Sequence, residues 1–211
     1  MAASVDFIDT FYKSIRDLHS VRFSLDEDHA AELVEILKRA AKDISDHTGK
    51  LLHELHEKKP DEDVLQTMIS ASPSSLNYTD ANDQLPIHSA VFHPDSLPYI
   101  TFLAKEGVKH KVGGEDGRGG LLVYTPVFNT SNILGINALQ SLGIMHSRDI
   151  TFRDPNDKVF FDVMKELKEA NLITEGDIED YDLLYLTSRF SVCKQRFDFF
   201  CDWCPEGLKH H

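Results

Sequence analysis

The chain has 211 residues, of which 41% are hydrophobic and 27% are charged, a composition typical of globular proteins. Its 35 acidic residues outnumber the 22 basic ones, and the formal net charge is -13. A field of this sign repels nucleic-acid phosphates and anionic lipid headgroups, so we expect neither nucleic acid nor a membrane as a partner. Basic protein surfaces remain possible partners.

The start of the chain lacks the basic region and the long apolar core of a signal peptide. No apolar run approaches the roughly 20 residues that a membrane-spanning helix needs. The three cysteines do not predict a disulfide framework. We therefore expect a soluble, cytoplasmic protein in a reducing compartment.

Hydrophobic periodicity predicts two amphipathic helices near the start, over residues 5–19 and 29–46. The Ser and Asp residues of the intervening linker can cap the second helix. That helix is expected to bury several apolar side chains: Ala30, Leu33, Val34, Ile36, Leu37, Ala40 and Ile44. Residues 1–46 are thus predicted to form an N-terminal helical cap.

Short helices are predicted from residue 47 onward. One covers residues 50–56, and another begins near Pro60 and stops at the loop of residues 70–75. Leu85 and Pro86 follow a polar turn, and proline suits the first turn of a helix. The partner helix through residues 97–103 is expected to end at Gly107, a plausible C-terminal cap.

The last third of the chain is less regular. A strand-like piece is predicted at residues 150–153, and a strong helix covers residues 157–170. Two more helices are predicted at residues 177–190 and 194–203, the second rich in aromatic side chains.

Part of this pattern repeats. Residues 84–92 align without a gap on residues 120–128, an offset of 36, and Ile87-His88 falls on Leu52-His53, an offset of 35. The polar turns repeat as well, because Asp80-x-x-Asp83 lies 36 residues before Asp116-x-x-Gly119. The fourth turn residue is of a type that a left-handed backbone position accepts. Asp154-x-x-Asp157 and Asp177-x-x-Asp180 extend the series irregularly.

A turn followed by two helices with a period of 33 to 36 residues is typical of helical solenoids. The turn and the run Leu85-Pro-Ile-His-Ser-Ala90 resemble the ankyrin repeat, in which the turn precedes Thr-Pro-Leu-His-x-Ala. Residues 80–107 match best, residues 47–76 more loosely, and residues 116–143 keep the turn with Tyr124 in the His slot. The competing interpretation is an irregular all-α bundle with chance similarity.

The resemblance implies an all-α, ankyrin-like helical solenoid of about four to five degenerate repeats with atypical caps at both ends. Residues 47–143 would form ankyrin-like repeats, and residues 144–211 a degenerate repeat and a C-terminal helical cap. In the family pattern His53 and His88 are structural and hydrogen-bond between adjacent repeats.

The resemblance also implies that a protein partner binds the concave face of turn tips and first helices. Carried over by position, eight residues are predicted to bind the partner: Gln84, Ser89, Phe92, His93, Arg118, Thr125, Phe128 and Asn129. Gly49, Glu54 and Glu57 would occupy this face in the first repeat. Phe92 and Phe128 are either anchors for the partner or packing beneath the next repeat. We expect a monomer.

A second possibility is a small regulatory or structural module with a zinc site. Cys193, Cys201, Cys204, His210 and His211 have the residue types that zinc prefers. Buried free cysteines among aromatic side chains explain Cys201 and Cys204 better, because the usual second Cys-x-x-Cys is missing. The spacing His53-x-x-His56 lacks accompanying acidic ligands, so we predict no metal there.

Little in the chain predicts catalysis. The glycine-rich residues 113–120 lack the Lys-Ser/Thr pair of a phosphate-binding loop. The acidic triplets at residues 26–28 and 61–63 precede helices, where carboxylates favour the helix dipole. We therefore expect a non-enzymatic interaction scaffold without a cofactor.

Overall fold

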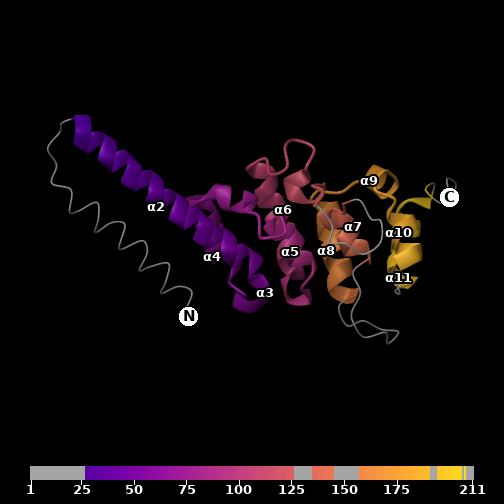
Figure 1. The fold of residues 1–211 in the computed structure, drawn as a ribbon. Helices are drawn as coiled ribbons and strands as arrows, with labels where there is room; N and C mark the ends of the chain where they lie inside the picture. Colours follow the sequence, from indigo (N-terminus) through magenta and orange to yellow (C-terminus); the bar gives the residue numbers. More distant parts are fainter. Residues whose placement is uncertain (1–26, 126–134, 145–156, 191–193, 206, 208–211) are drawn as a thin grey trace.

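The computed structural model describes residues 27–125, 135–144, 157–190, 194–205 and 207 (Figure 1). These ranges contain helices and turns but no strand, so the all-α prediction is confirmed. The α-helices are α2 Glu27–His53, α3 Leu55–Lys58, α4 Glu62–Ala71, α5 Pro86–Val91, α6 Ile100–Lys109, α7 Ala138–Ile144, α8 Asp157–Glu169, α9 Glu175–Asp180, α10 Leu183–Phe190 and α11 Lys194–Trp203. Three 3₁₀ helices are η1 Pro73–Asn77, η2 Pro94–Tyr99 and η3 Arg118–Gly120.

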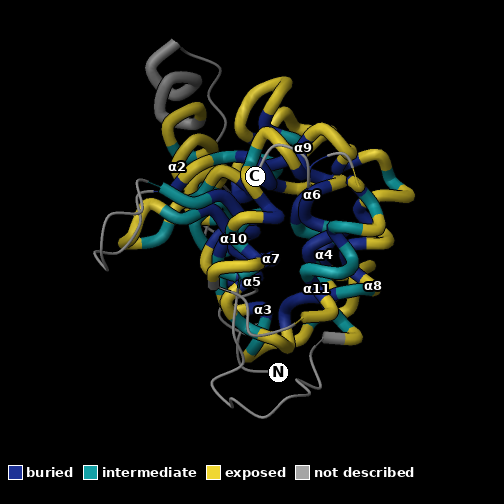
Figure 2. The backbone as a smooth tube through the Cα atoms, turned by 90° about the vertical axis from the view of Figure 1, so that its right-hand side faces the viewer, coloured by how far each residue is buried: buried dark blue, intermediate teal, exposed yellow. Residues whose placement is uncertain are grey.

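The helices are arranged along the length of the molecule, from α2 at one end through α5 and α6 to α10 and α11 at the other (Figure 1). Helix α5 packs between α2 and α7, α7 packs against α10, and α6 packs against α8. In the view of Figure 2, α5, α7 and α10 lie on one side and α4, α6, α8 and α11 on the other. One continuous cluster of buried side chains runs from Leu51 in α2 to Cys204 after α11. The core therefore joins both ends of the described chain.

Helix α2 is longer than predicted, because the helices expected at residues 29–46 and 50–56 are largely one. It passes through the boundary expected between residues 46 and 47 and reaches His53. Gly49 lies inside it and is buried, since a Cβ there would come within 2.3 Å of Cγ in the Tyr78 ring. The glycine permits a close approach of α2 to the segment after η1 and offers no surface to a partner.

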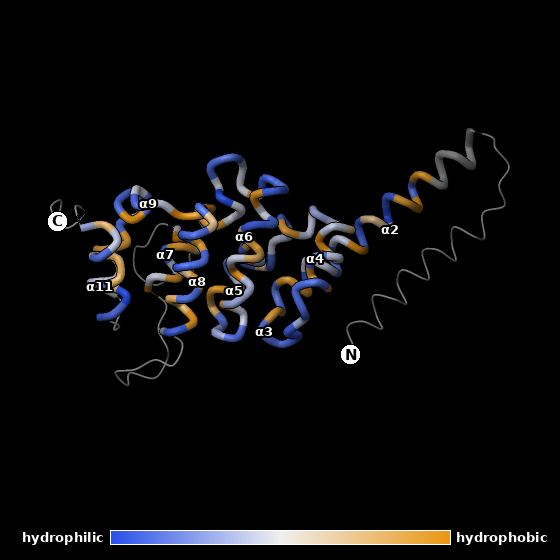
Figure 3. The backbone as a smooth tube through the Cα atoms, turned by 180° about the vertical axis from the view of Figure 1, so that it is seen from behind, coloured by the Kyte–Doolittle hydropathy of each residue, from blue (hydrophilic) through white to orange (hydrophobic). Residues whose placement is uncertain are grey.

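The N-terminal part of α2 extends away from the other described helices, with hydrophilic and hydrophobic stretches alternating along it (Figure 3). Val34 and Leu37 are 47% and 48% exposed, so the expectation that α2 buries them is wrong for the described chain. The helix predicted at residues 5–19 and the strand-like piece at residues 150–153 lie outside the described residues.

Gly107 is not the end of α6, which continues to Lys109. A Cβ on Gly107 would come within 2.3 Å of the Gly119 carbonyl oxygen. The glycine is needed because the backbone of the third turn lies directly against this helix. Gly119, with φ +69, and Asp83, with φ 55, adopt the left-handed conformation expected for the fourth residue of their turns. Asp180, by contrast, lies within α9.

Residues 116–143, the third unit of the predicted repeat, differ in structure from residues 80–107, the second unit, with which they were aligned. Residues 121–125 are not helical, and of the helices after η3 it is α7 that packs against α5. Thr125 instead forms an antiparallel bridge with Ile136. Residues 121–125 therefore do not form the first helix of a third repeat, which the gapless alignment would require.

The C-terminal helices follow the prediction closely. Helix α8 begins at Asp157, and α11 covers residues 194–203 as expected. The single helix predicted at residues 177–190 is two, α9 and α10, because Asp182 takes a left-handed φ of 52 between them.

Candidate functional site

A hollow of about 390 Å³ lies beside α5 and holds four of the predicted partner-binding residues. We call it the inner hollow; its lining residues are His53, Asp80, Asn82, Gln84, Ser89, Phe92 and His93. They come from the end of α2, the turn before α5, α5 itself and the start of the following segment. Gln84, Ser89, Phe92 and His93 thus lie together around one hollow.

The polar turn positions the rim of the hollow. The Asp80 carboxylate accepts hydrogen bonds from the backbone N–H groups of Asn82, at 2.8 Å, and Gln84, at 3.0 Å. The Gln84 carbonyl accepts a third bond from the Asp80 N–H at 3.1 Å. Aspartate commonly closes turns in this way, because its short side chain reaches the backbone two residues on. The turn thereby fixes where Gln84 stands before α5 begins.

His88 joins this turn to the next one. The Leu85 N–H donates to His88 Nδ1 at 3.2 Å, so that nitrogen carries no proton. His88 Nε2 therefore carries the proton and donates to the Val123 carbonyl at 2.8 Å. Burial is the main reason that the pKa of His88 is lowered, since burial disfavours the charged imidazolium. His88 is a structural residue that holds α5 against the third turn.

His53, at the end of α2, has a similar structural role 35 residues before His88. Its Nε2 lies 3.1 Å from the Tyr78 carbonyl, which can only accept, so Nε2 is the protonated nitrogen. Nδ1 then accepts from the Ser89 hydroxyl at 2.6 Å. A serine donating to an oriented imidazole is also how a nucleophile and its base are arranged. Here both bonds connect α2, the segment after η1, and α5.

Two histidine rings stack at the edge of the hollow. The rings of His56 in α3 and His93 lie with centroids 3.7 Å apart and planes 5° apart. Burial lowers the pKa of His93, and the neighbouring His56 adds to the effect. His56 Nδ1 is buried and has no hydrogen-bond partner among the described residues. Two cationic rings would repel at this distance, which agrees with the lowered pKa of His93.

Phe92 is the one large apolar side chain that lines the inner hollow, and it is 40% exposed. It lies at the end of α5, after Val91, and its side chain is not part of the buried core. Of the two alternatives for Phe92, packing beneath the next unit accounts for only part of its surface. The remaining surface is available for contact with another molecule.

Two other predicted residues lie elsewhere and are used within the protein. Thr125 is 4% exposed, and its hydroxyl donates to the Ile136 carbonyl at 3.1 Å. Arg118 forms an ion pair with Asp177 and donates to the Leu172 carbonyl. Neither belongs to the inner hollow, because the third unit does not repeat the geometry of the second. Phe128 and Asn129 lie outside the described residues.

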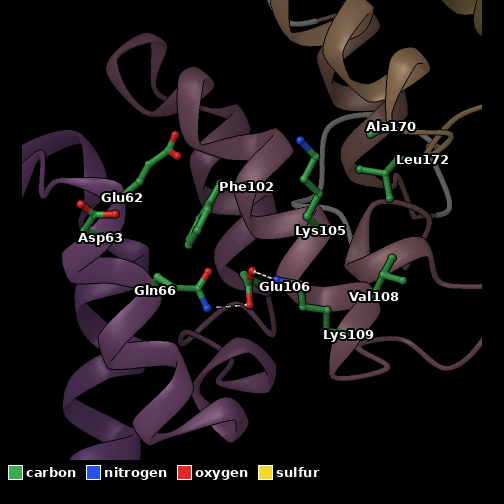
Figure 4. Close-up of a pocket in the computed structure, with 10 residues that line it drawn as sticks. All are labelled: Glu62, Asp63, Gln66, Phe102, Lys105, Glu106, Val108, Lys109, Ala170 and Leu172. Carbon is green, nitrogen blue, oxygen red and sulfur yellow. Dashed lines mark hydrogen bonds and ion pairs between the residues drawn. The ribbon is translucent and has the colours of Figure 1, made fainter.

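The structure adds residues that the repeat alignment did not assign to a partner. His53, Asp80 and Asn82 line the inner hollow, and only the turn itself signalled the last two. A second groove of about 450 Å³ lies between α4 and α6 (Figure 4). The acidic triplet at residues 61–63 was its only signal in the sequence.

The cysteines of the zinc hypothesis are only partly described. Cys204 is buried, and its thiol lies 3.5 Å from a carboxylate oxygen of Glu179. Burial raises the pKa of both the Cys201 and the Cys204 thiols, which disfavours the thiolate form that binds zinc. Within the described ranges no three His, Cys, Asp or Glu residues are grouped as metal ligands. Cys193, His210 and His211 lie outside those ranges.

The chain matches no protein-family model, no curated protein and no solved structure among those compared with it. Within the part of the chain that the structure describes, no helix is long and apolar enough to cross a membrane.

Proposed function

We propose that the chain is an ankyrin-like helical solenoid, of about four to five degenerate repeats, that binds a protein partner and catalyses no reaction. The family pattern expects a histidine that joins each repeat to the next. The hydrogen bonds of His53 to Tyr78 and of His88 to Val123 support this, because the two histidines lie 35 residues apart and serve neighbouring units.

The observation that carries the binding proposal is the half-exposed Phe92 within a hollow of hydrogen-bonding side chains. Aromatic side chains surrounded by polar groups dominate the energetics of many protein interfaces. The Gln84 side chain makes no hydrogen bond to any described residue and offers both a donor and an acceptor. We propose that a partner places an apolar side chain on Phe92 and hydrogen-bonds Gln84.

Charge narrows the class of partner. The net charge is -13, and Asp83 is exposed in the turn beside the hollow. A partner surface with basic residues around an apolar one would be complementary to this face. Such a partner would be a cytoplasmic protein, bound by one copy of the chain.

The test is affinity purification from the native cell, with quantitative mass spectrometry, using wild-type protein, Phe92→Ala and Val64→Ala. Val64 is a matched control, because it is 48% exposed on α4, away from the hollow. We expect a set of proteins that wild type and Val64→Ala retain and that Phe92→Ala reduces at least about fivefold, as loss of roughly 1 kcal/mol would. If all bound proteins survive Phe92→Ala while its melting temperature is unchanged, the inner hollow is not the binding site.

A further inference from the structure

The groove between α4 and α6, which we call the outer groove, lies apart from the proposed partner site; it is lined by Glu62, Asp63, Gln66, Phe102, Lys105, Glu106, Val108, Lys109, Ala170 and Leu172. It lies between α4 and α6, and the turn after α8 closes its far side. In Figure 4 the Phe102 ring projects from α6 toward the α4 side chains of Glu62, Asp63 and Gln66.

The floor of the groove is a buried carboxylate. Glu106 is 3% exposed, and it accepts a hydrogen bond from Gln66 Nε2 at 3.2 Å across the gap between the helices. It also pairs with Lys109 on its own helix. These bonds hold α4 and α6 at the separation that leaves the Phe102 ring half-buried between them. The groove is therefore built by a specific polar network and not by loose packing.

The wall toward α4 is acidic and has no partner among the described residues. Glu62 and Asp63 are exposed, and neither forms an ion pair with any described cation. Burial, followed by the carboxylates of Asp61 and Glu62, raises the pKa of nearby Tyr99, which is consistent with a negative potential here. Lys105 lies on the other side, toward Ala170 and Leu172 (Figure 4). The negative charges of the groove thus lie on α4, on the side of the Phe102 ring, and the Lys105 ammonium lies on the opposite side.

We propose that the outer groove binds a segment of another protein through an arginine side chain. The guanidinium would lie on the Phe102 ring and hydrogen-bond the Glu62 and Asp63 carboxylates. An arginine fits this set better than a lysine, because its planar group stacks on a ring while its N–H donors reach two carboxylates. The 47% exposed side chain of Val108 supplies an apolar surface for a neighbouring residue of the segment.

The probe for this site is the peptide acetyl-Gly-Ala-Arg-Leu-Gly-amide, followed by NMR titration of the isotope-labelled full chain. The same peptide with citrulline, which has the shape of arginine but no charge, and with lysine are the comparison probes. We expect the arginine peptide to shift the amide signals of residues 62–66 and 102–109. It should bind about fivefold more tightly than the citrulline peptide, as an exposed charge contact worth about 1 kcal/mol allows.

Two double variants distinguish specific binding in the outer groove from general attraction to a negatively charged protein. Glu62→Gln/Asp63→Asn removes the acidic wall, and Asp162→Asn/Glu166→Gln removes the same charge from exposed positions on α8. Only the first should weaken binding of the arginine peptide, by about fivefold. Phe92→Ala should leave it unchanged, so this result is independent of the inner hollow. Equal losses in both double variants, equal affinity of the citrulline or lysine peptide, or shifts that map elsewhere would overturn the proposal.

Discussion

At the scale of single residues, His53 and His88 use their two ring nitrogens in related ways. Each directs Nε2–H at a backbone carbonyl of a later segment, and each accepts a bond at Nδ1. The Leu85 N–H can only donate, so protonation of His88 at Nδ1 would break that bond. The stability of the contact between α5 and the third turn is therefore linked to the titration of His88.

The pH dependence has a definite sign. Burial lowers the pKa of folded His88 below 6.5, so the unfolded chain binds the proton more readily. Stability should be constant above about pH 7 and fall below pH 6.5, by up to about 1.4 kcal/mol per pH unit for this one group. His93, whose pKa is also lowered, acts in the same direction. Urea unfolding at several pH values measures the slope, and His88→Gln should make it shallower; an unchanged slope would contradict the assignment.

The contact between Gly107 and Gly119 permits a second residue-scale prediction. Gly107→Ala should destabilise the protein by about 1–3 kcal/mol, because the added methyl group meets a backbone oxygen that cannot move aside. Gly176→Ala is the control, since nothing lies closer than 3.8 Å to its Cβ position in α9. That change should be neutral or stabilising by less than about 1 kcal/mol. Chemical denaturation compares the two, and similar losses would argue against the close approach.

At the scale of elements, turns connect units that are distant in sequence. Arg118 of η3 pairs with Asp177, which is buried at the start of α9 and also accepts from the Thr174 N–H and hydroxyl. Asp177 thus caps its own helix and binds the third turn. Helices α7 and α8 lie between these two elements in the sequence. The ion pair therefore joins residues that are 59 positions apart.

A double-mutant cycle with Arg118→Met and Asp177→Asn should give a coupling free energy of about 1–3 kcal/mol, because Asp177 is buried. The exposed pair Lys165–Glu169 on α8 is the comparison. Its coupling should be about 0.5 kcal/mol or less, since solvent screens both charges. Equal coupling in the two cycles would show that the Arg118 pair does not join the elements.

At the scale of the whole molecule, one core extends from α2 to the segment after α11. Leu52 lies near one end of it with no exposed surface, and Trp203, the single tryptophan, lies near the other. Because the core is continuous, we expect that a loss of packing at one end also lowers the stability of the other end.

Leu52→Ala should destabilise the protein by about 2–5 kcal/mol, the usual range for a buried leucine. Trp203 fluorescence and far-UV circular dichroism should report the same shifted midpoint, because the two ends unfold together. A fluorescence transition that keeps its wild-type midpoint would show that the C-terminal helices unfold separately.

Much of the helical structure was predictable from local signals. The apolar stripes of α8 and α11, Pro86 at the first turn of α5 and the left-handed fourth residues of two turns all act within a few residues. These features depend on backbone preference and side-chain spacing, which the sequence contains directly. The assignment of Gln84, Ser89, Phe92 and His93 to a partner-binding face rested on the resemblance to the ankyrin repeat and stays a prediction.

Tertiary contacts decided the rest. The sequence by itself determined that the chain is helical and that Asp80 begins a turn before α5. Only the folded chain showed that residues 121–125 are not helical and that α7 packs on α5. It also showed that Gly107 lies against the backbone of Gly119 and that Arg118 faces Asp177. Gly107 and Gly119 are 12 residues apart in the sequence, and Arg118 and Asp177 are 59 residues apart. No local pattern specifies such pairs, because they depend on how the shared core brings the helices together.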